Sequence, residues 1–113
     1  MVSPAAGAVI LVRFPFSDLS QTKLRPAIVL ADAGREDWVL CQVTSNAYAD
    51  PRAIELGQVD FAMGSLHVVS YARPGKLFTA SHSLIEAQVG KLKAQRLGEI
   101  IESVVTLLRG GPR

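Results

Sequence analysis

The most informative part of the sequence is Arg13-Phe14-Pro15-Phe16-Ser17-Asp18-Leu19-Ser20-Gln21-Thr22-Lys23-Leu24-Arg25-Pro26-Ala27-Ile28-Val29-Leu30. Short apolar runs at 9–12 and 27–30 are typical of strands, and the polar residues between them favour a loop. We expect strands over 8–14 and 26–32, joined by a loop over 15–25. Pro26 biases Arg25 towards an extended backbone, because the proline ring clashes with a helical residue before it. Arg25 is therefore expected at a strand entrance, where binding and catalytic groups are common.

Further short strands are expected over 38–44, 53–56, 66–72 and 76–79, with a break at 73–75. Residues 38–44 are apolar on both alternating faces, with Trp38 and Leu40 on one and Cys41 and Val43 on the other, which indicates a central strand. Short strands separated by turn residues point to a small β-barrel or open barrel. Residues 80–92 are ambiguous, because Ser83 and Glu86 have helical capping-box spacing while Gly90 would soon interrupt a helix.

The C-terminal region predicts one helix over 93–109, ended by Gly110 and Gly111. Apolar residues recur at the spacing of a single helical face, which must pack on another element because the isolated helix would be marginal in water. The stripe consists of Leu97, Ile100, Ile101, Val104, Val105 and Leu108.

Composition limits the class of protein. The 113 residues suit one domain, 1–113, and the 49% apolar content is enough to fill one core. The net charge of +2 is too small to indicate nucleic-acid binding, so any affinity for nucleic acid must come from locally placed cations. The only cysteine, Cys41, is expected to be a small buried hydrophobe. No metal-ligand spacing occurs, so neither a metal nor another cofactor is expected.

The apolar segment at 5–12 is too short to span a bilayer and has no basic leader before it. A cytoplasmic protein without membrane association is therefore the default expectation.

An ordered set of motifs extends from Gly7 to about Leu108. It begins with Gly7, Phe14-Pro15-Phe16-Ser17-Asp18 and Lys23-x-Arg25-Pro26-Ala27-x-Val29-Leu30. It continues with Val43-Thr44-Ser45, Ile54-Glu55-Leu56, Ser70-Tyr71-x-Arg73, Lys76-Leu77-Phe78-Thr79 and Gly90-Lys91-Leu92. In content and order this set resembles the MazF/PemK family of toxin ribonucleases.

The resemblance implies a mainly β fold of the α+β kind: a small SH3-like, strongly curved antiparallel β-barrel with a C-terminal α-helix. It also implies a homodimer that cleaves single-stranded RNA and a small cognate antitoxin that covers the RNA groove. Cleavage in this family is metal-independent: the ribose 2′-hydroxyl attacks phosphorus, leaving a 2′,3′-cyclic phosphate and a 5′-hydroxyl. Arg25 matches the family's catalytic arginine and Thr44 its catalytic hydroxyl, although each taken alone also suits an ordinary loop cation or strand residue.

Several further residues are candidates for contacts with RNA. The hydroxyl of Ser45 could support Thr44, and an aromatic such as Phe16 could stack on a base or on a dimer mate. Lys23, Arg52, Arg73 and Lys76 are candidates for phosphate contacts, and the alternative is that they are only surface charges. His67 and His82 are interpreted as incidental. The full set of RNA-contact candidates is Phe16, Lys23, Ser45, Arg52, Arg73 and Lys76.

Two alternative functions remain at the level of sequence. One is a non-catalytic SH3-like barrel that binds RNA or protein through the same loops. The other is a gyrase-inhibiting toxin similar to CcdB, although the CcdB proteins lack this Arg-Pro loop pattern. A cleavage assay separates all three, because only the nuclease degrades RNA.

Overall fold

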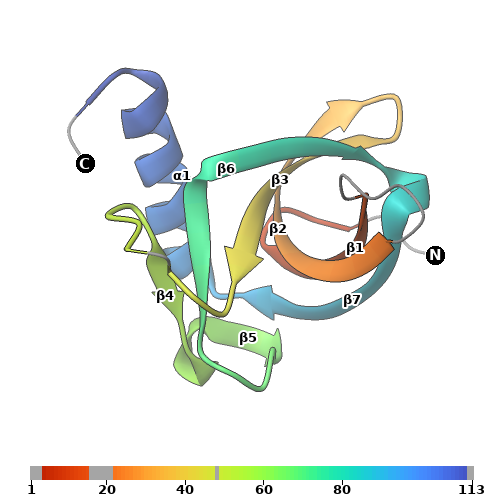
Figure 1. Ribbon diagram of the computed structural model, residues 1–113, viewed down its shortest axis with the longest axis horizontal. Helices are drawn as coiled ribbons and strands as arrows, with labels where there is room; N and C mark the ends of the chain where they lie inside the picture. The colour runs from red at the N-terminus through yellow and green to blue at the C-terminus, as the bar shows by residue number, and fades with distance from the viewer. Residues whose placement is uncertain (1–3, 16–21, 48, 112–113) are drawn as a thin grey trace.

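The computed structural model describes residues 4–15, 22–47 and 49–111. Figure 1 shows a strongly curled sheet with the C-terminal α-helix at one side. The strands are β1 (Ala8–Pro15), β2 (Thr22–Gly34), β3 (Asp37–Thr44), β4 (Ile54–Leu56), β5 (Phe61–Gly64), β6 (Ser70–Ser81) and β7 (Ile85–Leu92). The helical elements are the short 3₁₀ turns η1 (Gln58–Asp60) and η2 (His82–Leu84) and the helix α1 (Ala94–Leu108).

All seven described strands belong to one antiparallel sheet in the order β4-β6-β3-β2-β1-β7-β5. The sheet curls into a half-barrel, which confirms the prediction of a small, strongly curved antiparallel fold with a C-terminal helix. The position of β3 between β2 and β6 confirms that it is a central strand.

Both faces of the central strands are buried, because successive side chains of a strand point to opposite faces. One apolar cluster contains Ile10, Trp38 and Leu40, and the other contains Cys41 together with Ile100 of α1. The helix therefore covers the second face. Its predicted stripe is buried at Ile100 and Val104, but Leu108 is 72% exposed, so the buried stripe ends before the helix does.

The loop predicted over 15–25 is shorter than expected. Pairing of β1 with β2 continues as far as Pro15 and Thr22, so β2 begins four residues earlier than the predicted strand. Arg25 consequently lies inside β2 opposite Val12, and the expectation that it stands at the strand entrance is wrong. Thr22 and Lys23 fall within the predicted loop, but the backbone ladder to β1 holds them in the sheet.

The strand boundaries near residue 70 also differ from the prediction. Residues 65–69 form a turn-rich connection in which Ser65 Oγ accepts the His67 N–H at 2.8 Å, and His67 has a positive φ of 67°. β6 then runs without interruption through the predicted break. The register shift between Cys41 opposite Leu77 and Gln42 opposite Arg73 marks a bulge, which accommodates Pro74 because proline has no N–H for the ladder.

Residues 80–92 form the short turn η2 followed by strand β7, which resolves the ambiguity in favour of a strand. β7 pairs with both β1 and β5, and Glu86 forms an ion pair with Arg13 of β1. Pairing on two sides outweighs the local helical spacing of Ser83 and Glu86, since the sheet satisfies the backbone groups of the whole segment.

Candidate active site

A pocket of about 430 Å³ lies at the ends of β2 and β3, beside the connection from β5 to β6. It brings together side chains that are far apart in the sequence, including Arg25 and Thr44. Its described lining consists of Leu11, Lys23, Leu24, Arg25, Pro26, Val43, Thr44, Ser45, Leu66, Val68 and Ser70.

Sheet register explains why Arg25 and Thr44 meet. β2 and β3 pair through Ile28 with Cys41 and Ala27 with Gln42. Ala27 lies two residues from Arg25 along β2, and Gln42 lies two residues from Thr44 along β3, so both side chains come to the same end of the paired strands. There both line one pocket. The approach is therefore set by backbone pairing rather than by a mobile loop.

Thr44 is held from two sides. It is the last residue of β3, where it pairs with Tyr71 of β6, and only 9% of its surface is exposed. Its Oγ1 accepts the N–H of Asn46 at 3.2 Å, which leaves the hydroxyl hydrogen able to donate to a ligand. A hydroxyl held in this way suits the binding of an anionic oxygen.

The pocket combines positive charge with apolar walls. Lys23 and Arg25 supply two cations, and the described lining contains no carboxylate and no imidazole. Leu24 and Val68 are 51% and 62% exposed, so the walls offer apolar surface to a ligand. Two cations, three hydroxyls and exposed apolar side chains match the chemistry of a nucleotide, which carries a phosphate and a flat base.

The sequence prediction missed most of the apolar lining. Leu66 and Val68 were assigned to an alternating strand, whereas they lie in the connection that precedes β6. Leu24 was assigned to a polar loop. The sequence carries no signal for them, because their exposure and their place beside Arg25 depend on the fold.

The other predicted RNA contacts are dispersed. Ser45 and Lys23 line the same pocket as Arg25, whereas Arg52 lines a separate hollow against α1 with Glu102. Lys76 is exposed on β6. Phe16 lies outside the described residues.

Arg73, the remaining candidate, forms an ion pair. Its Nε donates to Asp50 Oδ2 at 2.9 Å, and only 18% of its side chain is exposed. It does not line the pocket of Arg25 and Thr44.

A family model described as PemK-like, MazF-like toxin of type II toxin-antitoxin systems matches residues 5–108. The chain belongs to the PemK/MazF family. This is a family of endoribonuclease toxins, as the resemblance in the sequence had implied. A search of curated protein sequences gives no match.

Solved structures of MazF proteins share the fold of this PemK/MazF chain. A MazE–MazF structure from Deinococcus radiodurans has a TM-score of 0.76 at 24% identity, covering 94% of this chain and 96% of that one. An endoribonuclease from a mycobacterial species has a TM-score of 0.72 at 19% identity, with 100% and 97% covered. A mycobacterial endoribonuclease in complex with its cognate antitoxin has a TM-score of 0.68 at 16% identity, with 100% and 99% covered.

Other chemistry is limited in this PemK/MazF chain. Cys41 is fully buried, and burial raises the pKa of its thiol to about 12, so it is not a thiolate at neutral pH. No group of His, Cys, Asp and Glu suited to a metal ion occurs among the residues that the structure describes. In the same part of the chain, no helix has the length and apolar character needed to cross a membrane.

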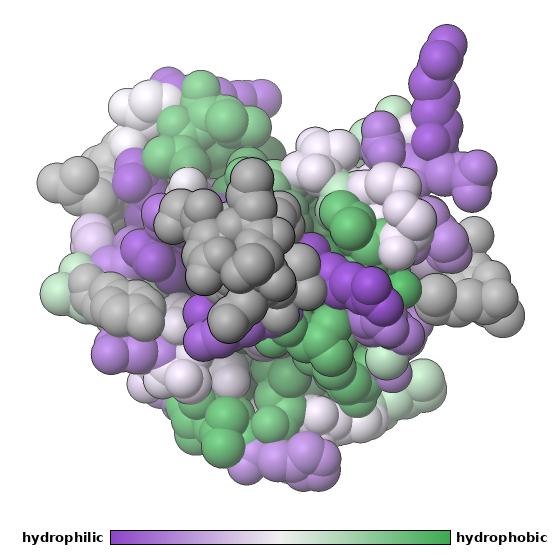
Figure 2. Space-filling model, turned by 45° about the vertical axis from the view of Figure 1, so that its right-hand side comes forward, coloured by the Kyte–Doolittle hydropathy of each residue, from purple (hydrophilic) through white to green (hydrophobic). Residues whose placement is uncertain are grey.

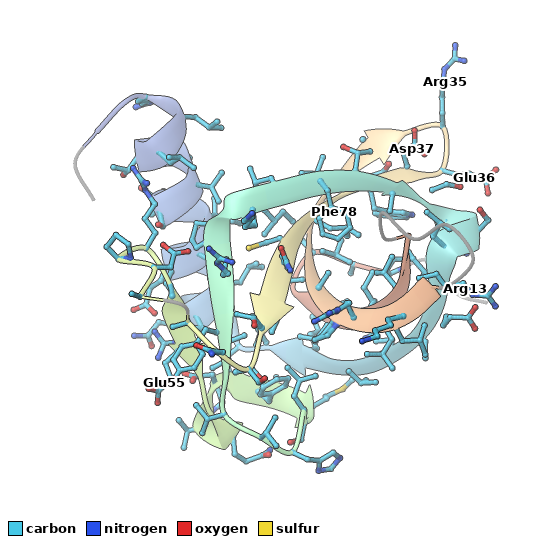
Figure 3. All side chains as sticks on the ribbon, viewed as in Figure 1. Arg13, Arg35, Glu36, Asp37, Glu55 and Phe78 are labelled. Atoms are coloured by element: carbon cyan, nitrogen blue, oxygen red, sulfur yellow. The ribbon has the colours of Figure 1, made fainter. Side chains whose placement is uncertain are left out.

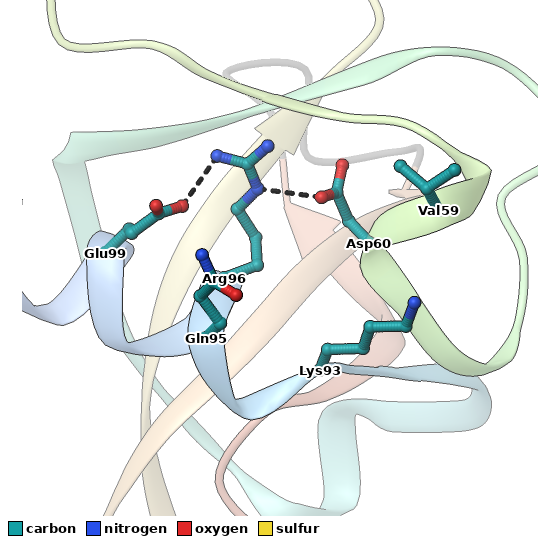
Figure 4. Close-up of a pocket in the computed structure, with 6 residues that line it drawn as sticks. All are labelled: Val59, Asp60, Lys93, Gln95, Arg96 and Glu99. Atoms are coloured by element: carbon teal, nitrogen blue, oxygen red, sulfur yellow. Dashed lines mark hydrogen bonds and ion pairs between the residues drawn. The ribbon is translucent and has the colours of Figure 1, made fainter.

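Two aspartates of the chain have similar environments. Burial alone would raise the pKa of Asp50 and of Asp60, but hydrogen bonds and nearby cations outweigh it and lower both pKa values below the usual range. Asp60 Oδ1 accepts from Arg96 Nε at 3.0 Å, and Arg96 also contacts Glu99, as Figure 4 shows. These two aspartates form a matched pair of ionic contacts in different parts of the molecule.

Proposed function

We propose that this PemK/MazF chain is the toxin of a type II toxin–antitoxin pair and cleaves single-stranded mRNA without a metal ion. The observation that supports this most directly is the shared pocket of Arg25 and Thr44. The resemblance assigns catalytic roles to these two residues, and the family model spans both positions.

The proposed reaction is an internal transesterification. The 2′-oxygen of the ribose forms a bond to phosphorus, the bond from phosphorus to the 5′-oxygen breaks, and the 2′ proton is lost. The 5′-oxygen gains a proton, so the products carry a 2′,3′-cyclic phosphate and a 5′-hydroxyl. Negative charge accumulates on the phosphorane oxygens between these two events.

Arg25 is proposed to stabilise that charge, because a guanidinium presents two parallel N–H donors to two phosphate oxygens. Thr44 is proposed to hydrogen-bond the phosphate or orient the 2′-hydroxyl. Neither is a proton acceptor at neutral pH, because a guanidinium cation has no lone pair to take a proton and a neutral alcohol is a very weak base. The two groups therefore act by charge stabilisation and orientation. Lys23 and Ser45 are proposed to bind phosphate oxygens in the same pocket.

Two protein partners are part of the proposal. Relatives have been crystallised as MazE–MazF and with a cognate antitoxin, and we propose a cognate antitoxin for this chain as well. We also propose a homodimer. Several large hydrophobic side chains are exposed, and Figure 2 shows hydrophobic patches among hydrophilic ones on the surface. A contact between two copies would remove such patches from water.

The test is incubation of the purified protein with a long single-stranded RNA in EDTA. Cleavage is expected, with 5′-hydroxyl ends that polynucleotide kinase labels directly. Arg25→Ala is expected to lower the rate by about 10²–10³-fold, the usual effect of removing a preorganised donor. Arg109→Ala is the control of equal charge change, since Arg109 is an exposed residue at the end of α1.

Intact RNA at high protein concentration would instead support the non-catalytic binding barrel. Inhibition of gyrase supercoiling with RNA left whole would support the CcdB-like alternative. A wild-type rate in Arg25→Ala would remove Arg25 from the site.

A further inference from the structure

The connection that follows Thr44 crosses from one side of β6 to the other. Thr44 pairs with Tyr71 of β6, and the next strand, β4, pairs with the opposite edge of β6 through Ile54 and Ala72. Figure 1 shows β3 and β4 on either side of β6. The connection, described at residues 45–47 and 49–53, therefore follows Thr44 directly, begins with the pocket residue Ser45 and passes the strand that bears Arg73.

Asp50 fixes this connection near its middle. Its backbone N–H donates to the carbonyl of Ala47 at 2.9 Å, and its own carbonyl accepts from Ala53 at 3.1 Å. Its side chain makes two further contacts: Oδ1 accepts the N–H of Arg52 at 2.9 Å and Oδ2 accepts Nε of Arg73 at 2.9 Å. The backbone of Asp50 thus belongs to two successive turns, and its carboxylate ties the second of them to β6.

The contact between Asp50 and Arg73 is well shielded. Only 14% of the Asp50 side chain and 18% of the Arg73 side chain are exposed, and charge-assisted hydrogen bonds are stronger than neutral ones. The lowered pKa of Asp50 agrees with a carboxylate that is charged in the folded state. The loop is therefore anchored by an ion pair that water does not easily replace.

We propose that Asp50 and Arg73 are positioning residues for the hydroxyl of Thr44, with Arg73 acting through Asp50 rather than on the RNA. This rests on the proposed function. The loop contacts the hydroxyl through Asn46, whose backbone N–H donates to Thr44 Oγ1. If the crossing loop shifts, this hydrogen bond changes and the hydroxyl loses its orientation. A displacement of about 1 Å at a reacting group can reduce a rate about 10²-fold.

The matched control is the ion pair between Asp60 and Arg96. It has the same Nε-to-carboxylate geometry, at 3.0 Å, and the same 14% exposure of the aspartate side chain. Asp60 also accepts a backbone N–H, from Gly57 at 2.8 Å. It ties η1 to the start of α1, and neither partner lines the pocket of Arg25 and Thr44.

The first test compares Asp50→Ala with Asp60→Ala in RNA cleavage at saturating and subsaturating substrate. Asp50→Ala is expected to lower kcat by about 10- to 100-fold with KM changed less than about threefold, and Asp60→Ala to leave kcat within about twofold. Asp50→Asn, which keeps one acceptor oxygen for Arg73, should recover part of the loss. A rise in KM with unchanged kcat would overturn the inference, as would equal kcat losses in the two alanine variants.

The second test is a double-mutant cycle with Thr44→Ala. If Asp50 acts through the Thr44 hydroxyl, Asp50→Ala should cause less than about a twofold further loss once that hydroxyl is gone. If the rate losses of the two single variants multiplied in the double variant, the inference would be contradicted.

A third readout does not depend on cleavage. In amide NMR spectra, Asp50→Ala should shift the signals of Ser45 and Asn46, whereas Asp60→Ala should not. If the wild-type protein leaves RNA whole, the proposed function fails, and these shifts still decide whether the ion pair sets the geometry at Thr44. Unchanged signals in Asp50→Ala would overturn the inference. Should Asp50→Ala not fold, the amide spectra of Arg73→Gln and Arg96→Gln are compared instead. Only Arg73→Gln is expected to shift the signals of Ser45 and Asn46.

Discussion

The ion pairs of Asp50 with Arg73 and of Asp60 with Arg96 are nearly identical in geometry and differ in what they hold. Each joins a guanidinium Nε to an aspartate at 2.9–3.0 Å, and each aspartate also accepts one backbone N–H. The first anchors the connection that carries Thr44 and Ser45, and the second anchors the start of α1. We expect the first contact to affect both cleavage and stability and the second to affect stability alone, because they fix different elements.

Removal of the cation should separate the two pairs most strongly. Arg73→Met leaves the Asp50 carboxylate shielded and without its ionic partner, and we expect the free energy of unfolding to fall by about 1–3 kcal/mol. Arg96→Met should cost less, because Arg96 is 30% exposed and water can replace more of its contact. Urea denaturation of both variants measures the difference. A larger loss of unfolding free energy in Arg96→Met than in Arg73→Met would contradict this expectation.

Acid should weaken both ion pairs and so lower the stability of the protein. Each aspartate has a lowered pKa in the folded state, so its stabilising contribution is complete above the unfolded pKa of about 3.9 and is lost as the pH falls through the folded pKa. We expect the wild-type Tm to drop below about pH 4. Asp50→Asn and Asp60→Asn should each flatten that drop, because asparagine does not titrate.

Thermal unfolding between pH 2.5 and 6 measures this effect. If either variant retained the full wild-type slope, that aspartate would not be linked to stability in the way its contacts indicate.

The smallest effect concerns the second contact of Arg96. Glu99 is three residues further along α1 and its side chain is 48% exposed. Exposed helical pairs of this spacing contribute about 0.2–0.5 kcal/mol, so Glu99→Gln should lower the free energy of unfolding by no more than that. A loss near that of Arg96→Met would mean that Arg96 acts through Glu99 rather than Asp60.

A second outer pair gives a reference for surface charge. Arg13 and Glu86 form an ion pair between β1 and β7, with side chains 55% and 34% exposed, and Figure 3 shows Arg13 at the outside of the curled sheet. Arg35, at the turn between β2 and β3, extends into solvent in the same view. Neither residue lines the pocket of Arg25 and Thr44. Added salt should therefore screen these exposed charges without changing the residues that form the site.

Much of the fold was predictable from periodicity. Alternation of apolar residues identified the central strand at Trp38, and the helical stripe identified the buried Ile100. Three features depended on pairing that local sequence does not encode. β2 extends to Thr22 because β1 is beside it, Ser83 precedes a strand because β1 and β5 flank β7, and β6 crosses Pro74 through a bulge.

The site was predictable to a different degree. The choice of Arg25 and Thr44 came from the resemblance to the family. Their shared pocket depends on the pairing of β2 with β3, which brings the ends of the two strands together, and the partner of Arg73 depends on the path of the loop past β6. The contact of Asp50 with Arg73 has no signal in the sequence, since nothing near Asp50 points to an arginine on a later strand.

The most direct test of the central claim is single-turnover cleavage of RNA in EDTA by Arg25→Ala, Thr44→Ala and the double variant. If both groups act on one phosphodiester, the double variant should be about as slow as the slower single variant, because residues that act as a unit are strongly non-additive. Rate losses that multiply fully in the double variant would show that Arg25 and Thr44 act independently, and would contradict the account.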